Sequence, residues 1–179
     1  MSRLVKISKY LSKYLRHSPH EIGLTLAPGG WVGIEDLLTT CAKHGFPITR
    51  SELDLVVSTD DKQRYSFDVD RVRIRANQGH STDVDLQLRK ETPPAVLFHG
   101  TCTRFLDTIL SEGLRKMKRH HVHLSIDAET ATKVGRRHGN PVVLEVDAAG
   151  MVDAGYEFFV SENGVWLTDA VPPKFLKVI

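Results

Sequence analysis

The first half of the chain repeats apolar residues at helical spacing and then at strand spacing. Steps of three and four residues predict three helices, each with one buried stripe, over residues 4–17, 34–44 and 50–57. Gly45 ends the second helix, and Thr49 with Glu52 forms a capping box that opens the third. Two strands, 64–67 and 72–76, follow. Three helices and a hairpin in this order are typical of a winged-helix lobe.

The second half has the short apolar segments of a small, mostly antiparallel sheet. Its first strand, Ala95 to Thr101, carries no charge, follows two prolines and is expected to be buried. Further strands are expected at 122–125, 141–146, 158–160, 164–168 and 175–179. The periodicity also predicts helices at 104–112 and 128–134. We therefore expect an α+β fold with one lobe over residues 1–92 and another over 93–179.

Three local details complete this prediction. Thr103 and Asp127 are placed to cap the two helices of the second lobe. The first of these helices should bury its apolar face, which consists of Phe105, Leu106, Ile109 and Leu110. Residues 82–91 have the composition of a linker, with one strand at 84–88.

Composition narrows the class of protein. The chain has 179 residues, 41% of them hydrophobic, which is enough for two small cores. It has no run of 18 apolar residues and no apolar export segment, so we expect a cytoplasmic protein without membrane contact. Its two cysteines, Cys41 and Cys102, are too few for a disulfide framework or a thiolate metal site.

The net charge of +2 does not by itself indicate a nucleic-acid binder, but the cations are clustered. Five lie in residues 3–16 before any acid, others follow the hairpin at 62–75, and a third group fills the loop 115–121. Arg73 and Arg75 should share one face of their strand, with Ile74 pointing into the core. Tyr65 and Phe67 are the aromatic residues of the hairpin that could stack on bases.

Two strands of the second lobe end on a histidine and a hydroxyl. His99, Gly100 and Thr101 end one strand, and His123 and Ser125 lie on another. Imidazole nitrogens and hydroxyls suit sugar or phosphate oxygens, and the glycine would let a ligand approach the backbone closely. The alternative is a strand that runs into an ordinary turn.

A metal site is disfavoured in the loop that precedes the second of these strands. His120, His121 and His123 could bind zinc, but no carboxylate or thiol stands beside them and Arg119 would repel a cation. We expect an anion partner and no metal.

Several motifs, taken in this order, resemble the RNA 2′-phosphotransferase family. They are Leu15-Arg16-His17, Gly30-Trp31, Lys62-Gln63-Arg64-Tyr65-Ser66, Ile74 to Ser81, Phe98-His99-Gly100-Thr101, Val122-His123-Leu124-Ser125 and Glu162-Asn163-Gly164-Val165-Trp166-Leu167. Motifs along the whole chain are more specific than any one of them. The resemblance implies a winged-helix lobe followed by a lobe with the ADP-ribosyltransferase fold.

The resemblance also implies an activity, the removal of an internal 2′-phosphate from RNA, which is a step of fungal tRNA splicing. NAD serves as the acceptor. The 2′-phosphate attacks the nicotinamide-bearing ribose carbon and expels nicotinamide, which gives RNA-2′-phospho-ADP-ribose. The adjacent ribose hydroxyl then attacks the phosphate and releases 2′-hydroxyl RNA and ADP-ribose 1″,2″-cyclic phosphate.

The family's functional residues map onto matching positions of this sequence. The catalytic set implied by the resemblance is Arg16, His17, Arg64 and Arg119. The implied NAD-binding residues are His99, Gly100, Thr101, His123 and Ser125, to which Asn77, Gln78, Gly79 and His80 contribute. Arginine suits the chemistry, because its planar fork donates to phosphate oxygens in a fixed geometry.

Two alternatives remain open. The first is an ADP-ribosyltransferase that acts on nucleic-acid phosphate ends, and the second is a module that binds NAD or RNA without catalysis. Many transferases of the wider fold carry a glutamate where this chain has Val165, which argues against a protein-modifying enzyme. The expected partners are 2′-phosphorylated RNA and NAD, and we expect a monomer.

Overall fold

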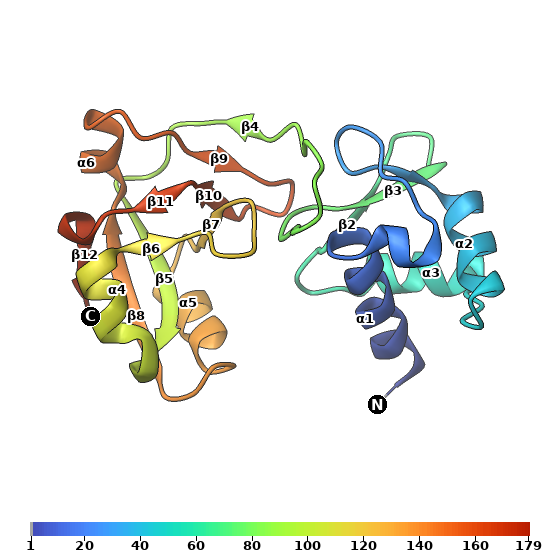
Figure 1. The fold of residues 1–179 in the computed structure, drawn as a ribbon, viewed down its shortest axis with the longest axis horizontal. Coiled ribbons are helices and arrows are strands. Elements are labelled where there is room, and N and C mark those ends of the chain that lie inside the picture. The colour runs from blue at the N-terminus through green and yellow to red at the C-terminus, as the bar shows by residue number, and fades with distance from the viewer. Residues whose placement is uncertain (1) are drawn as a thin grey trace. The chain divides into compact units, whose positions relative to one another are not determined.

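The computed structural model describes residues 2–179, which divide into two compact units, residues 2–87 and 88–179. We refer to them as the first and second units. The first unit contains helices and one small antiparallel sheet, and the second contains helices and three, so the chain has the α+β fold that the sequence predicts (Figure 1). Within the part of the chain described, no helix is long and apolar enough to cross a bilayer.

The first unit has the predicted order of three helices followed by a hairpin. Its elements are α1 (Arg3–Arg16), η1 (Pro19–Ile22), β1 (Val32–Gly33), α2 (Ile34–Lys43), α3 (Arg50–Ser58), β2 (Tyr65–Phe67) and β3 (Arg73–Ala76). The three strands form one antiparallel sheet in the order β1-β3-β2. This order is that of a winged helix, and the assignment to that fold stays a prediction.

Local sequence explains where these helices begin. The Thr49 side chain accepts from the Glu52 backbone N–H at 3.2 Å, and the Glu52 carboxylate accepts from the Thr49 N–H at 3.0 Å, so the predicted capping box is confirmed. Hydrogen bonds from Arg3 and from the Thr49 backbone lower the pKa of Glu52 to about 2. The carboxylate that caps α3 therefore stays ionised at neutral pH.

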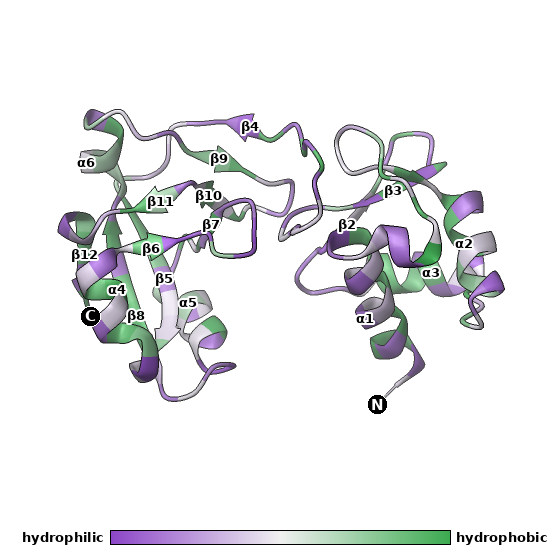
Figure 2. Cartoon of the chain, in the orientation of Figure 1, coloured by the Kyte–Doolittle hydropathy of each residue, from purple (hydrophilic) through white to green (hydrophobic). Residues whose placement is uncertain are grey.

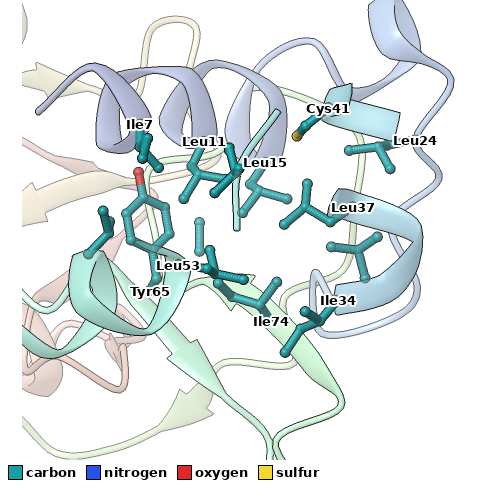
Figure 3. Packing of buried hydrophobic residues seen from close by; sticks show 14 of the residues in the cluster. Ile7, Leu11, Leu15, Leu24, Ile34, Leu37, Cys41, Leu53, Tyr65 and Ile74 are labelled. Atoms are coloured by element: carbon teal, nitrogen blue, oxygen red, sulfur yellow. The ribbon is translucent and has the colours of Figure 1, made fainter. Parts of the chain in front are cut away.

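The core of the first unit is built on one stripe of α1. Ile7, Leu11 and Leu15 project from the helix toward α3 and the hairpin (Figure 3). Along α1 hydrophobic residues are interspersed with hydrophilic ones, as the mixed colours of the helix show (Figure 2). Ile74 is fully buried in the same cluster, as the strand periodicity predicts. The Tyr65 ring is also part of this core, and its hydroxyl donates to the Ser8 carbonyl at 2.6 Å.

The second unit contains three sheets and three α-helices within residues 88–179. Its elements are β4 (Arg89–Lys90), β5 (Val96–Cys102), α4 (Thr103–Glu112), β6 (Leu114–Arg115), β7 (Val122–Leu124), α5 (Ala128–Gly135), β8 (Pro141–Asp147), α6 (Ala148–Asp153), β9 (Phe159–Val160), β10 (Trp166–Thr168), β11 (Ala170–Val171), η2 (Pro173–Phe175) and β12 (Leu176–Val178). The sheet orders are β4-β9-β10-β7, β11-β6 and β12-β8-β5, and every pairing is antiparallel. A bridge between Phe98 and Ser125 joins β5 to β7.

Two predictions for the second half are wrong. Residues 84–88 do not form a strand, because the Asp85 carbonyl accepts from Gly29 at 2.7 Å and its carboxylate caps the Gln87 N–H. The strand in this region is β4, two residues long. Thr103 does not cap α4 but is its first helical residue, and the N-cap position, Cys102, makes no side-chain cap.

The apolar face of α4 is narrower than the pattern indicates. Leu106 and Ile109 pack against the core of the second unit, whereas Phe105 and Leu110 are 41% and 40% exposed. The guanidinium carbon of Arg104 lies 4.5 Å from the centre of the Phe105 ring, which covers part of that ring.

Strand β5 and helix α5 approach each other at two glycines. A Cβ at Gly100 would overlap the Ala131 carbonyl oxygen, and a Cβ at Gly135 would overlap the Thr101 carbonyl oxygen. Neither glycine needs an unusual backbone angle. A side chain is excluded at both positions because the backbones of β5 and α5 lie in direct contact there. The contact with α5 is thus a structural reason for glycine at position 100, and the expectation that a ligand approaches the backbone there stays a prediction.

We expect Gly100→Ala to lower the free energy of unfolding by at least about 3 kcal/mol, because neither backbone can yield without moving α5. Gly155→Ala is the matched control. Gly155 has a positive φ but nothing within 4 Å of its missing Cβ, so its cost should be about 1 kcal/mol. Denaturant unfolding of both variants measures the difference, and equal losses would contradict the packing argument.

Candidate functional site

The end of α1 is tied to a segment that follows the hairpin. The Arg16 carbonyl accepts from the backbone N–H groups of Ser81 and Thr82, at 2.9 and 3.2 Å. His17 Nδ1 lies 2.9 Å from the Ser81 hydroxyl. Helix ends leave carbonyls without helical partners, and here the segment from residue 77 onward supplies two of the missing donors.

Arg64 joins the same place from strand β2. Its carbonyl accepts from the Arg16 guanidinium at 3.3 Å and from the Asn77 N–H at 2.9 Å. The Arg16 guanidinium carbon lies 5.8 Å from the centre of the Tyr65 ring. The structure therefore brings together three of the four predicted catalytic residues, although Arg16 and Arg64 are 48 residues apart in sequence.

Asp60 holds Arg64 in place, and the sequence analysis did not identify it. One carboxylate oxygen forms an ion pair with Arg64 Nη1, and the other accepts from the Arg64 backbone N–H at 2.8 Å. The Asp60 side chain is only 7% exposed, whereas that of Arg64 is 31% exposed. The signal in the sequence is an aspartate four residues before the arginine, across a turn in which Gln63 has a φ of 44°.

Residues 77–80 lie on the first unit and are mostly buried. The Asn77 amide donates to the Gln63 carbonyl at 2.7 Å. Gly79 has a φ of 85°, and a Cβ there would lie 3.5 Å from Arg16 Nη1. His80 is buried, and its Nε2 lies 3.4 Å from the position of a Cβ on Gly30. Gln78 is half-buried, and a role for these residues in binding NAD stays a prediction.

The arginines of the hairpin are less available to a ligand than the sequence indicates. Asp54 pairs with both Arg50 and Arg71, and Asp68 pairs with Arg73. The Phe67 ring of the hairpin is covered too, because the guanidinium carbons of Arg50 and Arg71 lie 5.5 and 4.6 Å from its centre.

The strand periodicity of these arginines is confirmed. Arg73 and Arg75 both lie over the Trp31 ring, at 5.5 and 4.5 Å from its centre, so they share a face as predicted. The basic residues of the hairpin are thus held by carboxylates and aromatic rings of their own unit.

In the second unit the two histidine-bearing strands lie together. Phe98 and Ser125 exchange two backbone hydrogen bonds, of 2.8 and 2.7 Å, where β5 meets the end of β7. His99 Nδ1 donates to the His123 carbonyl at 3.0 Å, and His123 Nδ1 donates to the His121 carbonyl at 3.0 Å. Both rings therefore carry their proton on Nδ1 when neutral, which leaves Nε2 as an acceptor.

Burial lowers the pKa of His99 below its ordinary value. The hydrogen bond to the His123 carbonyl opposes this effect, while the charges of Arg119 and His138 add to it. Arg119, the fourth predicted catalytic residue, is thus near enough to His99 to act on its charge. It is exposed in the loop before β7, where its N–H donates to the Lys116 carbonyl at 3.0 Å.

Two other features of the second unit differ from a simple anion site. Thr101 is only 4% exposed, so little of its hydroxyl is offered to a ligand. The basic loop also has acidic neighbours, because Arg115 pairs with Glu112 and Lys116 lies 3.6 Å from Asp169. Within residues 2–179 no group of three or more histidines, cysteines or carboxylates is placed to hold a metal ion.

The lowered pKa of His99 predicts how stability changes with pH. Because the folded protein resists protonation of this ring, the unfolded chain binds the proton more readily. His99 therefore lowers stability as the pH falls through the ordinary histidine value of about 6.5. We expect His99→Gln to lose less stability than the wild type between pH 8 and pH 5. The free energy of unfolding of both proteins is measured at pH 8, the baseline, and at pH 5. An equal loss of stability in the variant and in the wild type would contradict the prediction.

Known proteins that resemble this chain cover it from end to end. Residues 2–170 match the family described as "RNA 2'-phosphotransferase, Tpt1 / KptA family". A probable RNA 2′-phosphotransferase of Nostoc punctiforme is 61% identical over 178 residues, which are 99% of this chain and 98% of the relative. Proteins with the same description from Streptomyces griseus and Flavobacterium johnsoniae are 58% and 48% identical, over 97% and 96% of this chain and 96% and 94% of their own lengths. The chain belongs to the RNA 2′-phosphotransferase family.

Proposed function

We propose that this protein is an NAD-dependent RNA 2′-phosphotransferase. It removes an internal 2′-phosphate from RNA by transfer to ADP-ribose, through RNA-2′-phospho-ADP-ribose. The products are 2′-hydroxyl RNA, nicotinamide and ADP-ribose 1″,2″-cyclic phosphate. The residues assigned to catalysis are Arg16, His17, Arg64 and Arg119, and those assigned to NAD include His99, His123 and Ser125.

The observation that carries this proposal is the meeting of Arg16, His17 and Arg64 in the first unit. The Arg16 guanidinium donates to the Arg64 carbonyl although the two residues are far apart in sequence, and the neighbouring His17 ring lies 2.9 Å from the Ser81 hydroxyl. The Arg64 guanidinium is held by the Asp60 carboxylate. A phosphate dianion needs directed cationic donors to bind, and a pentavalent phosphorane needs them more. Family membership supplies the substrate class, since the relatives are described as RNA 2′-phosphotransferases.

His17 is suited to move a proton in the second step. The Ser81 hydroxyl lies 2.9 Å from Nδ1 and orients the imidazole ring. The step requires a ribose hydroxyl to lose its proton as it attacks the phosphate. His17 is exposed at the end of α1, where the helix dipole stabilises the imidazolium that results.

The second unit supports the assignment of NAD by its donor and acceptor chemistry. A neutral His99 with its proton on Nδ1 presents Nε2 as an acceptor for a ribose hydroxyl, and its lowered pKa keeps it neutral at pH 7. The nearby Arg119 suits the charged phosphate of the reaction. NAD supplies the ADP-ribosyl acceptor and a neutral leaving group, nicotinamide.

The test is incubation of the protein with NAD and a short RNA that carries one internal 2′-phosphate, with products identified by mass. We expect nicotinamide, 2′-hydroxyl RNA and ADP-ribose cyclic phosphate, each formed only when both substrates are present. A parallel RNA with only a 5′-phosphate tests the alternative of end ADP-ribosylation. Binding of both ligands without release of nicotinamide would overturn the proposal in favour of a non-catalytic module.

The arginines should matter most in the second step, because that step adds negative charge to a crowded phosphodiester. We expect Arg64→Ala and Arg119→Ala to accumulate RNA-2′-phospho-ADP-ribose, with its breakdown slowed about a hundredfold. Time courses on denaturing gels show the intermediate as a slower band.

Arg89→Ala is the matched control, because Arg89 is exposed and pairs with Glu91, the residue that follows β4. It should process the RNA at the wild-type rate. If the two test variants instead leave the 2′-phosphorylated RNA unreacted, with no slower band, the arginines act in binding or in the first step, and their assignment is wrong.

A further inference from the structure

A groove of about 320 Å³ lies on the first unit between α1 and the end of α3. Arg64, one of the proposed phosphate-binding residues, forms part of its wall. The groove continues beyond Arg64 along α1, where the proposed function assigns nothing. Its volume is at the small end of the range for ligand pockets, roughly 300–1,000 Å³, which fits one nucleotide and not a folded partner.

One face of α1 lines this groove and ends at the proposed catalytic residues. Val5, Lys9 and Ser12 are groove residues at steps of four and three, and the next step of four reaches Arg16. Residues at these steps lie on one side of a helix. This side differs from the stripe of Ile7, Leu11 and Leu15 that builds the core. A strand that entered at Arg16 and Arg64 would therefore meet these side chains next.

The lining of the groove combines the groups that RNA requires. Lys9 supplies an ammonium group that has no carboxylate within 4.0 Å in residues 2–179. Ser8 and Ser12 supply hydroxyls. Within residues 2–179 neither hydroxyl has a hydrogen bond, since the bond from Tyr65 to Ser8 is accepted by the Ser8 carbonyl. Cations and hydroxyls are the usual donors to the phosphates and riboses of nucleic acids.

The one acid of the lining does not oppose this charge. The Asp60 carboxylate is directed at Arg64 and at two backbone N–H groups, and its side chain is 7% exposed. Leu4, Val5 and Val56 add apolar groups to the same lining. A lining with both apolar and polar groups suits a nucleoside, whose ring faces are apolar and whose edges and phosphates are not.

We propose that this groove binds the nucleotide that adjoins the 2′-phosphorylated one, with Lys9 on its backbone phosphate. This rests on the proposed function, because Arg64 is taken as a ligand of the 2′-phosphate. The contact is independent of the base sequence of the RNA, since none of the groups that line the groove is arranged to read a base edge. The groove thereby distinguishes an RNA strand from a free 2′-phosphorylated nucleoside.

The test compares ligands of increasing length without NAD. Dissociation constants are measured by isothermal titration calorimetry for a nucleoside 2′-phosphate and for two versions extended by one nucleotide, on the 5′ or on the 3′ side. In the wild-type protein we expect one extension to lower Kd about fivefold. In Lys9→Ala the gain in affinity from the extension should fall below about twofold. The slope of log affinity against log salt concentration should become shallower by about 0.7.

Lys6→Ala is the matched control, because Lys6 is also an exposed lysine of α1 but does not line the groove. Both substitutions raise helix propensity slightly, and circular dichroism checks that α1 is kept. The gain from extension should survive in this control.

The outcomes separate this inference from the proposed function. If neither extension improves binding, or if Lys6→Ala abolishes the gain as fully as Lys9→Ala, the groove is not a nucleotide subsite. Turnover of the same ligands with NAD tests the proposed function independently. A protein that binds the extended RNA through Lys9 but releases no nicotinamide retains the subsite and lacks the activity.

Discussion

The first unit depends on how the carboxyl end of α1 is completed. An α-helix ends with carbonyls that have no partner within the helix, and at Arg16 the partners come from residues 81 and 82. This one contact fixes where the chain runs after the hairpin. The same segment reaches Arg64, because the Asn77 N–H donates to the Arg64 carbonyl, and it contacts His17 through the Ser81 hydroxyl. Main-chain hydrogen bonds thus join the segments of the candidate site, while Asp60 orients the Arg64 side chain.

The second unit uses a related device. His99 and His123 donate from Nδ1 to backbone carbonyls, so that the strands help to set the direction of each ring. The glycines at 100 and 135 set the distance between strand and helix in the same way, through backbone against backbone. Rings held by the main chain lose little freedom when a ligand binds, which favours a preorganised site.

Local signals account for most of what the sequence predicted correctly. The Thr49 and Glu52 capping box, the alternation around Ile74 and the Asp127 cap each depend on residues within a few positions of one another. What the sequence could not predict was partner choice. Nothing in the pattern showed that Asp54 would pair with Arg71, or that α5 would lie against Gly100, because those contacts join distant segments. The pair of Asp68 and Arg73 lies within the hairpin, and the sequence analysis did not single it out. The family resemblance named the site residues, while their environment came from the fold.

The ion pair between Asp60 and Arg64 has a consequence for the freedom of the arginine side chain. A guanidinium carries five N–H donors in a planar fork, and the contact with the Asp60 carboxylate engages the group at Nη1. Two backbone N–H groups hold that carboxylate in turn. Under the proposed function, the plane of the fork would be fixed before a phosphate arrives, and the side chain would lose little freedom on binding it.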